Sequence, residues 1–242
     1  MIVDMHCHVD LMPSMTSFAN EALEANIGLL AVTTTPLAYE KEISALRLFT
    51  NVRVALGLHP QLIGDRYSEI SIVEKYLKEA SYIGEIGLDF NKQFYYSKDK
   101  QLDAFERIIK GCTEIGGKTL SIHSVRADKP TLDVIEKYSA YKRNAIILHW
   151  FSGTQNQLHR AVQLGCYFSI NSAMVRSNNG RRIIQTIPVD RMLMESDAPF
   201  IGQINTAQEL LADLNYTMRW LSENIDTNIN HTITENNTAI FR

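Results

Sequence analysis

The sequence predicts an α/β fold, a TIM (β/α)₈ barrel that occupies residues 1–242 as one domain, and three observations support this prediction. Short apolar runs rich in β-branched residues alternate with amphipathic stretches of helical period. About eight such pairs fit into the chain, as expected for a barrel with few insertions. Histidines end the first predicted strand, after which an open doubly wound sheet would usually carry a glycine-rich turn.

The predicted strands are short and buried, and each is followed by a longer segment with one apolar face. The strands are predicted at Ile2–His8, Gly28–Thr34, Val52–Leu58, Tyr82–Leu88, Thr119–His123, Ala145–His149, Cys166–Ile170 and Arg191–Glu195. The helices are predicted at Ser17–Asn26, Glu40–Thr50, Glu69–Ala80, Asp99–Ile115, Thr131–Tyr138, Gln155–Leu164, Gly180–Thr186 and about Ala207–Asn224, the last of which closes the chain.

Composition excludes several classes of protein. The net charge of −3 gives no global basic footprint, so any contact with nucleic acid must depend on a local patch. Three scattered cysteines provide no disulfide framework and fit a reducing compartment. The sequence has neither a signal peptide nor an apolar run long enough to cross a membrane, and a cytoplasmic protein without membrane contact is expected.

Histidines and carboxylates gather at the predicted carboxyl ends of the strands, where barrels place their chemistry. Five of the seven histidines lie there. The residues are His6, His8, His59, His123 and His149, with Glu85, Asp89, Glu195 and Asp197. Each taken alone is more often an ordinary hydrogen-bonded residue, but a metal site explains all of the placements with one cause.

The first strand carries the pattern His6-x-His8. Residues two apart in a strand point to the same side, so both imidazoles would face one point inside the barrel mouth. Neutral imidazoles suit a borderline divalent cation such as zinc, manganese or nickel. Asp4 lies one layer deeper on that side and is expected to orient a ligand, whereas Cys7 points toward the helices as a packed residue.

Six ordered motifs carry a resemblance to a known family. They are Asp4-Met-His6-Cys-His8, Gly57-Leu-His59-Pro60, Gly84-Glu85-Ile-Gly87-Leu88-Asp89, Ile122-His123-Ser124, His149-Trp-Phe151-Ser152-Gly153 and Glu195-Ser-Asp197-Ala198-Pro199. Over residues 1 to about 200 the chain resembles the TatD DNase family of the amidohydrolase superfamily. The resemblance implies a metal-dependent hydrolase with two divalent metal ions, and members of the family are often described as magnesium-dependent.

The resemblance also implies a role for each motif residue. One metal would be held by His6, His8, Glu85 and Asp197, and the second by Glu85, His123 and His149, with Glu85 bridging the two. Asp197 would accept a proton from the attacking water, and Glu195 would add a ligand to a further metal during turnover. His59 resembles the family histidine that meets the substrate phosphate.

The chain departs from the family pattern where phosphate contacts are expected. Arg126 follows the position on strand five where the family commonly has arginine, which Val125 occupies here. Lys92 stands where an arginine often sits, and Gln61 replaces a frequent histidine. These departures leave the substrate or its binding mode more open than the metal centre.

Two further groups of residues are candidates for binding a nucleic acid. Arg176, Arg181 and Arg182 form a basic cluster after strand seven that suits phosphate contacts, although a solvated surface explains them nearly as well. Aromatic residues after strand four are candidates for stacking on the bases of a single strand, although such residues more often belong to the core. These residues are Phe90, Phe94, Tyr95 and Tyr96.

Three functions remain open at this point. The first is a deoxyribonuclease that digests single-stranded DNA ends with 3′→5′ polarity, and the second is a hydrolase of small amides, esters or D-aminoacyl bonds. The third is a metal-bound, non-catalytic subunit of a larger assembly. Compact chains with a short segment after Pro199 also resemble the nuclease component of Qat-type anti-phage defence systems, which implies protein partners in a defence complex.

Overall fold

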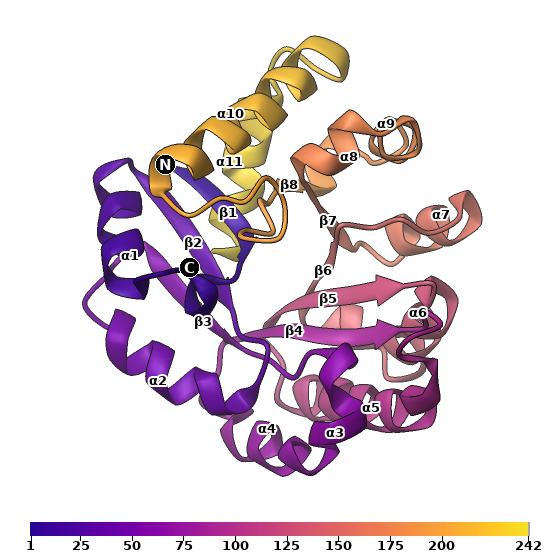
Figure 1. Ribbon diagram of the computed structural model, residues 1–242. Coiled ribbons are helices and arrows are strands. Elements are labelled where there is room, and N and C mark those ends of the chain that lie inside the picture. The colour runs from indigo at the N-terminus through magenta and orange to yellow at the C-terminus, as the bar shows by residue number, and fades with distance from the viewer. Residues whose placement is uncertain (242) are drawn as a thin grey trace.

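The computed structural model describes residues 1–241 and contains a parallel eight-stranded barrel (Figure 1). Each strand pairs with its neighbours in sequence order, which confirms the predicted fold class. The strands are β1 (Ile2–Cys7), β2 (Ile27–Val32), β3 (Val52–Leu56), β4 (Tyr82–Asp89), β5 (Thr119–Val125), β6 (Ala145–His149), β7 (Tyr167–Ile170) and β8 (Met192–Met194).

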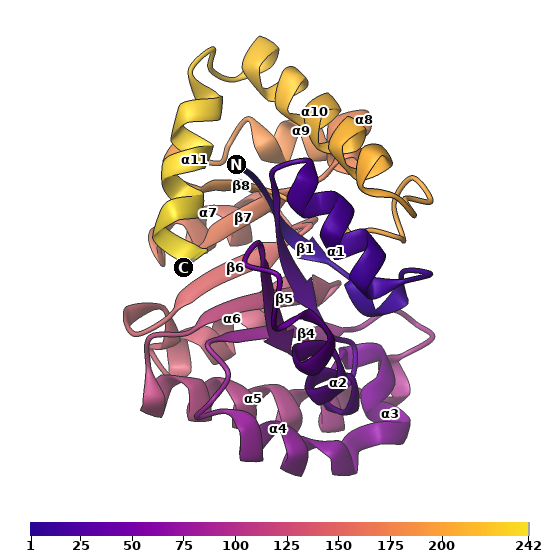
Figure 2. The ribbon, with the colours of Figure 1, turned by 90° about the vertical axis from the view of Figure 1, so that its left-hand side faces the viewer.

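Helices surround the strands on the outside of the barrel (Figures 1 and 2). Several begin with a side-chain cap, as at Ser14, Thr154 and Thr206, each of which accepts a hydrogen bond from a backbone N–H of the first turn. The helices are α1 (Met15–Glu24), α2 (Pro36–Leu46), α3 (Ile63–Arg66), α4 (Ile70–Tyr76), α5 (Lys98–Ile115), α6 (Asp128–Lys137), α7 (Gln155–Gln163), α8 (Ser172–Arg176), α9 (Asn178–Ile184), α10 (Ala207–Asn224) and α11 (Ile229–Ile240).

The first and last strands are joined by backbone hydrogen bonds at the residues that carry candidate ligands. The Asp197 N–H donates to the His6 carbonyl at 3.0 Å, and the His8 N–H donates to the Ala198 carbonyl at 2.9 Å. Closure of the barrel therefore places the segment after β8 directly beside the end of β1.

Two cores hold the barrel together. A smaller cluster inside the barrel includes Val3, Met5 and Leu193, and it extends to Ile240 in the last turn of α11. A larger cluster lies between the strands and the helices and contains the buried Cys7, as predicted. Val3 and Met5 lie in the inner cluster and Cys7 in the outer one, although all three are odd-numbered, because an irregularity in the pairing of β1 with β2 between Asp4 and Cys7 interrupts the alternation.

One helix contradicts the sequence prediction. The chain does not close with the helix at residues 207–224, because α11 follows it and packs across η6 (Val189–Arg191) and β8. Its sequence is rich in Asn and Thr, which have low intrinsic helix propensity. Tertiary contacts stabilise it instead: the Asn236 side-chain amide donates to the Val189 and Met192 carbonyls at 3.0 and 2.8 Å.

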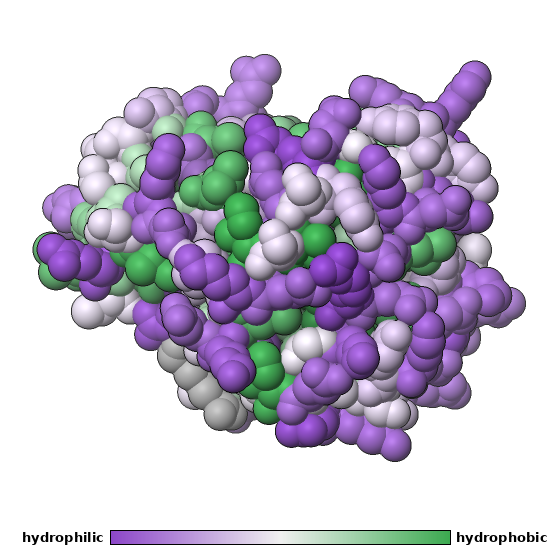
Figure 3. All heavy atoms as spheres, turned by 90° about the horizontal axis from the view of Figure 1, so that it is seen from below, coloured by the Kyte–Doolittle hydropathy of each residue, from purple (hydrophilic) through white to green (hydrophobic). Residues whose placement is uncertain are grey.

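The outer surface is mainly polar on the side seen in Figure 3, where hydrophobic side chains lie scattered among hydrophilic ones. Among the helices of residues 1–241, none is long and apolar enough to cross a membrane.

Candidate metal centre

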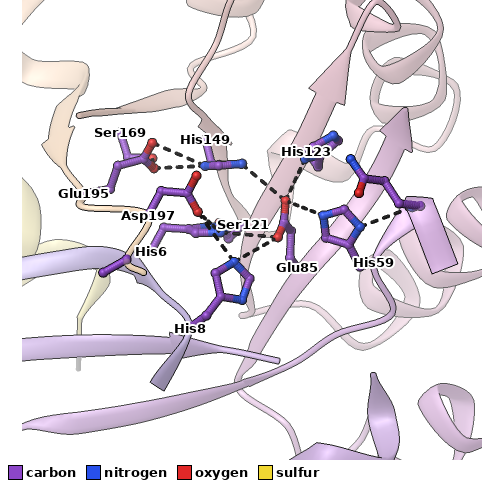
Figure 4. A network of polar contacts seen from close by, with 12 residues as sticks. His6, His8, His59, Glu85, Ser121, His123, His149, Ser169, Glu195 and Asp197 are labelled. Carbon is purple, nitrogen blue, oxygen red and sulfur yellow. Dashed lines mark hydrogen bonds and ion pairs between the residues drawn. The ribbon is translucent and has the colours of Figure 1, made fainter. Parts of the chain in front are cut away.

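The candidate ligands come from strands that are far apart in sequence and meet at the carboxyl end of the barrel (Figure 4). His6 lies in β1 and His8 follows it, Glu85 lies in β4, and His123 lies in β5. All four side chains are at least nine-tenths buried. The remaining candidates are His149 at the end of β6 and Asp197 after β8.

Glu85 lies at the centre of the cluster, and its Oε2 faces the pair of histidines from the first strand. The Nε2 atoms of His6 and His8 both lie 3.4 Å from this oxygen. Asp197 Oδ1 lies 3.8 Å from His6 Nε2 and 3.6 Å from His8 Nε2. His6, His8, Glu85 and Asp197 thus lie close together, and the first three form a group that could hold a metal ion.

The other Glu85 oxygen, Oε1, faces a second group of imidazoles. His123 Nδ1 lies 2.7 Å away, His149 Nε2 3.3 Å away and His59 Nε2 3.2 Å away. The two oxygens of Glu85 therefore face different sets of imidazole nitrogens. His59 lies close enough to belong to a ligand cluster with Glu85 and His123, in addition to its expected role at the phosphate.

Hydrogen bonds at the far side of two rings orient the nitrogens that face Glu85. His6 Nδ1 lies 2.8 Å from Ser121 Oγ, which leaves Nε2 directed at the centre. His123 is reversed: its Nε2 lies 3.2 Å from Asp89 Oδ2, so that Nδ1 faces Glu85. A partner on one ring nitrogen fixes the ring and the tautomer, and thereby presents the lone pair of the other nitrogen.

The rings of His149 and His59 are fixed in the same way. His149 Nδ1 lies 3.3 Å from both oxygens of Glu195, whose carboxylate also accepts hydrogen bonds from Ser169 and from Asn171, the latter at 2.8 Å. His59 Nδ1 accepts a hydrogen bond of 3.2 Å from the Gln61 N–H, so in the neutral ring the proton is on Nε2.

Asp4 orients the centre in a different way from the one predicted. It does not contact an imidazole, because its carboxylate accepts hydrogen bonds from the His6 N–H and from Ser196, whose N–H and hydroxyl lie 2.9 and 2.5 Å away. Ser196 separates Glu195 from Asp197. Asp4 therefore ties the backbone of two ligand-bearing segments together.

Burial and neighbouring charges shift the pKa values of the centre. Burial lowers the pKa of His6 to about 4, so its ring is neutral at physiological pH. Burial would also lower the pKa of His8, but Asp197 and Glu85 outweigh it and raise the pKa to about 9. The surrounding imidazoles hold the pKa of Glu85 well below its usual range despite its burial.

The donor set fits divalent cations. Four carboxylates are buried here, and within residues 1–241 no lysine or arginine forms an ion pair with any of them. His6 Nε2, which faces the centre, is buried without a hydrogen-bond partner. Buried anions and an open nitrogen lone pair of this kind are costly unless a cation binds. The carboxylates are Glu85, Asp89, Glu195 and Asp197.

Apart from His59, the residues expected to contact phosphate lie at the same end of the barrel but outside the cluster. Lys92 is exposed in the segment after β4, and Arg126 is exposed directly after β5 with a φ of 53°. Arg176 pairs with Asp213 at 3.5 Å, and the Arg181 Nε–H donates to the Val175 carbonyl at 2.6 Å. Arg182 is exposed on α9 beside them.

Aromatic side chains are exposed around the centre, and two of them were not among the predicted stacking residues. Phe200 is 64% exposed and its ring contacts His8 with centroids 5.0 Å apart, and Trp150, next to His149, is 38% exposed. Tyr95 and Tyr96, which were predicted, are 51% and 71% exposed. The indication that the sequence gives for Phe200 and Trp150 is that each lies within or directly after a motif that carries a candidate metal ligand.

The sequence also did not predict the buried side chains that hydrogen-bond to the candidate ligands. Ser121, Ser169 and Asn171 carry no metal-binding signature, and only alternation along the strands hints at their role. Ser121 lies two residues before His123, and Ser169 two residues before Asn171, so each pair shares a face.

The barrel and its buried His/Glu centre define a metal-dependent hydrolase. A family model described as "TatD related DNase" matches residues 3–242. The chain therefore belongs to the TatD DNase family.

Relatives of known name agree with this assignment. The chain is 26% identical over 220 residues to the human protein named deoxyribonuclease TATDN3. The alignment covers 83% of this chain and 79% of that protein. It is 28% identical over 235 residues to an uncharacterized metal-dependent hydrolase, YjjV, of Escherichia coli, covering 86% of this chain and 85% of the relative.

Solved structures show the same fold. The crystal structure of the E. coli TatD homologue YjjV superposes with a TM-score of 0.77 at 23% identity and covers 98% of this chain and 96% of that one. A TatD family hydrolase from Entamoeba histolytica superposes with a TM-score of 0.80 at 14% identity, covering 99% and 97% of the two chains.

Proposed function

We propose that this protein is a two-metal deoxyribonuclease that hydrolyses phosphodiester bonds at the ends of single-stranded DNA with 3′→5′ polarity. The observation that carries the proposal is the position of Glu85, with one oxygen facing His6 and His8 and the other facing His123 and His149. The deoxyribonuclease names of relatives support DNA as the substrate.

The proposed ligand sets follow the two faces of Glu85. His6, His8, Glu85 and Asp197 would hold one cation, and Glu85, His123 and His149 the other. When bound, zinc, manganese, nickel or magnesium would neutralise the charge of the phosphodiester and lower the pKa of water.

The protein groups then have separate tasks. Asp197, with Oδ1 facing His6 and His8, accepts the proton of the attacking water. His59 donates a hydrogen bond from its Nε2–H to a non-bridging phosphate oxygen, because its Nδ1 accepts from the Gln61 N–H. Glu195 holds His149 in the orientation that faces Glu85 and lies near enough to serve a further cation. Lys92 and Arg126 contribute positive charge where a bound strand would leave the mouth.

Metal analysis and digestion of labelled oligonucleotides test the proposal. Purified protein should release nucleotides from the 3′ end of a 5′-labelled single strand and stop when a chelator is added. His6→Ala and Asp197→Asn should each lower the rate by at least about a thousandfold, because catalysis requires both the metal and the base. His159→Ala, at an exposed histidine of α7, is the matched control and should retain full activity.

Two other outcomes identify the competing functions. Turnover of small amides, esters or D-aminoacyl compounds without release of nucleotides would replace the nuclease assignment. Full metal occupancy without any turnover, together with a co-purifying protein, would indicate a non-catalytic subunit.

A role in anti-phage defence is a narrower proposal that rests on the compact segment after Pro199 alone. In the structure this segment passes to α10 within a few residues and places Phe200 against His8. Plaque assays with the intact host operon and with His6→Ala would test it, since unchanged phage resistance would remove a nuclease role in defence.

A further inference from the structure

The end of the barrel opposite the metal centre contains a second candidate site. A cavity of about 1170 Å³ is lined by the first residues of β3 to β7, where the strands begin. The last turn of α11 borders it, and Figure 2 shows this helix at the end of the barrel where the strands start. Those first residues are Val52, Tyr82, Thr119, Ala145 and Tyr167. Catalysis at the mouth gives no reason for a cavity here.

Positive charge is concentrated in this cavity although the chain as a whole is acidic. Six of the 24 lysines and arginines line it, against one of the 27 acidic residues, Glu79. The six are Arg47, Arg53, Lys118, Lys142, Arg143 and Arg191. A concave surface of one sign focuses the electrostatic potential on anions.

Three of these cations are not neutralised by the protein. Arg47, Lys142 and Arg143 are exposed, and none of them forms an ion pair within residues 1–241. Some cations on the outer helices are paired instead: Arg107 pairs with Glu74 at 2.8 Å and Arg160 with Asp133 at 2.8 Å. The cavity therefore holds positive charge that is available to a ligand.

Aromatic rings accompany the cations. Tyr141 and Tyr167 line the cavity and are partly exposed. Lys142 Nζ lies 5.7 Å from the centroid of the first ring, and the Arg191 guanidinium lies 5.1 Å from that of the second. Lys142 has no ion pair within residues 1–241, whereas Arg191 pairs with Asp190 at 3.8 Å. Aromatic rings beside cations can contact a base together with its phosphate.

We propose that this cavity binds a nucleotide phosphate, either as a free mononucleotide or within a single strand. The unpaired charges of Arg47, Lys142 and Arg143 recognise the phosphate, and Tyr141 and Tyr167 contact the base. The volume of about 1170 Å³ is as large as that of small-molecule sites, which span about 300–1,000 Å³, and is sufficient for a nucleotide.

Binding to the full-length Asp197→Asn chain in EDTA isolates this site, because metal-dependent binding at the mouth is removed. Titrations would use dAMP, inorganic phosphate and the decamer dT10. Arg47→Glu, Lys142→Glu and Arg143→Glu combined should weaken dAMP binding by about tenfold or more and lower its salt dependence. The matched control combines Lys110→Glu, Lys129→Glu and Arg219→Glu on outer helices, and should change binding by less than about twofold.

Each outcome decides the proposal. Equal weakening by the two triple variants, or no binding of dAMP, overturns it. Inorganic phosphate that competes as well as dAMP also overturns it, because the rings would then contribute nothing. Tighter binding of dT10 than of dAMP supports the proposal with a strand as the source, and the reverse supports it with a free nucleotide.

Folding and catalysis serve as separate readouts. Replacement of the same three residues by Gln removes the charge without reversing it and should also weaken dAMP binding, with near-UV circular dichroism unchanged. Both triple variants, made without Asp197→Asn, should keep the hydrolytic rate at the mouth. Failure of the distal site and failure of the proposed nuclease function are thereby distinguishable.

Discussion

At the scale of single residues, hydrogen bonds determine which ring nitrogen of each histidine faces Glu85. Four of the five clustered imidazoles have a partner on the ring nitrogen that faces away from Glu85. The exception is His8, whose Nδ1 is buried without a partner. The centre thus depends as much on Ser121 and Glu195 as on the histidines that they hold.

The hydrogen bonds of the Ser196 hydroxyl lead us to expect an effect of this residue on metal affinity. It donates to Asp4 Oδ2 at 2.5 Å and accepts from the Ala198 N–H at 3.0 Å, between two candidate ligand residues. Ser196→Ala should weaken zinc binding by about tenfold, as measured with a competing chelator, because Asp197 loses its anchored backbone. Ser152→Ala, at an exposed position, is the control. Equal affinities in the two variants would contradict this role.

Glu42 predicts a dependence of stability on pH. It is 1% exposed, neither carboxylate oxygen has a hydrogen-bond partner, and burial together with the charge of Asp10 raises its pKa to about 8. The folded state therefore holds the proton more tightly than the unfolded chain does. The contribution of Glu42 to stability is full below about pH 4.5 and is lost as pH rises to about 8.

Glu42→Gln should remove this dependence. We expect the variant to exceed the wild-type free energy of unfolding by a margin that grows to a few kcal/mol between pH 5 and pH 8, as measured by urea titration. Glu40→Gln, on an exposed face of the same helix, should show a constant difference. A margin for Glu42→Gln that does not change with pH would refute the interpretation.

At the scale of elements, local signals determine where helices begin, and tertiary contacts determine whether weak segments become helical at all. Helix α10 begins with a capping box, in which Thr206 accepts from the Glu209 N–H and Glu209 accepts from the Thr206 N–H. This helix was predicted with its correct bounds. Helix α11 has no side-chain cap and was missed, because Asn236 stabilises it through contacts that no local pattern reveals.

Thr206→Ala tests whether the capping box stabilises α10. Loss of the cap should lower the free energy of unfolding by about 1 kcal/mol, because one N–H of the first turn loses its partner. Thr238→Ala in α11, where the hydroxyl bonds only to the Thr234 carbonyl of its own helix, should cost less. If the two variants lost the same stability in urea unfolding, the capping box would have no special role.

At the scale of the whole molecule, the two ends of the barrel carry opposite charge. Buried carboxylates gather at the carboxyl ends of the strands, and unpaired cations line the cavity where the strands begin. Protonated imidazoles such as that of His8 offset part of the repulsion among the carboxylates, and a bound divalent cation would offset more of it.

Cation binding should therefore stabilise the entire fold. Saturation with zinc or manganese is expected to raise the Tm by roughly 5–10 °C over the chelated protein, because the ions bind the folded state and not the dispersed ligands of the unfolded one. His6→Ala should abolish most of this increase in a thermal scan, whereas His159→Ala should retain it. A Tm that is insensitive to these ions would argue against the centre.

The sequence by itself determined the barrel and most of its metal-binding candidates, because both follow from short-range regularities. The alternation of side chains in a strand predicted that His6 lies beside His8. The positions of the strand ends indicated Glu85, His123 and Asp197 as candidates. Only the tertiary structure decided that Asp4 bonds to Ser196 rather than to an imidazole, that α11 exists, and that unpaired cations share a cavity. Barrel closure brings Asp4 to Ser196, and packing against η6 and β8 stabilises α11, so both features depend on residues that are distant in the chain.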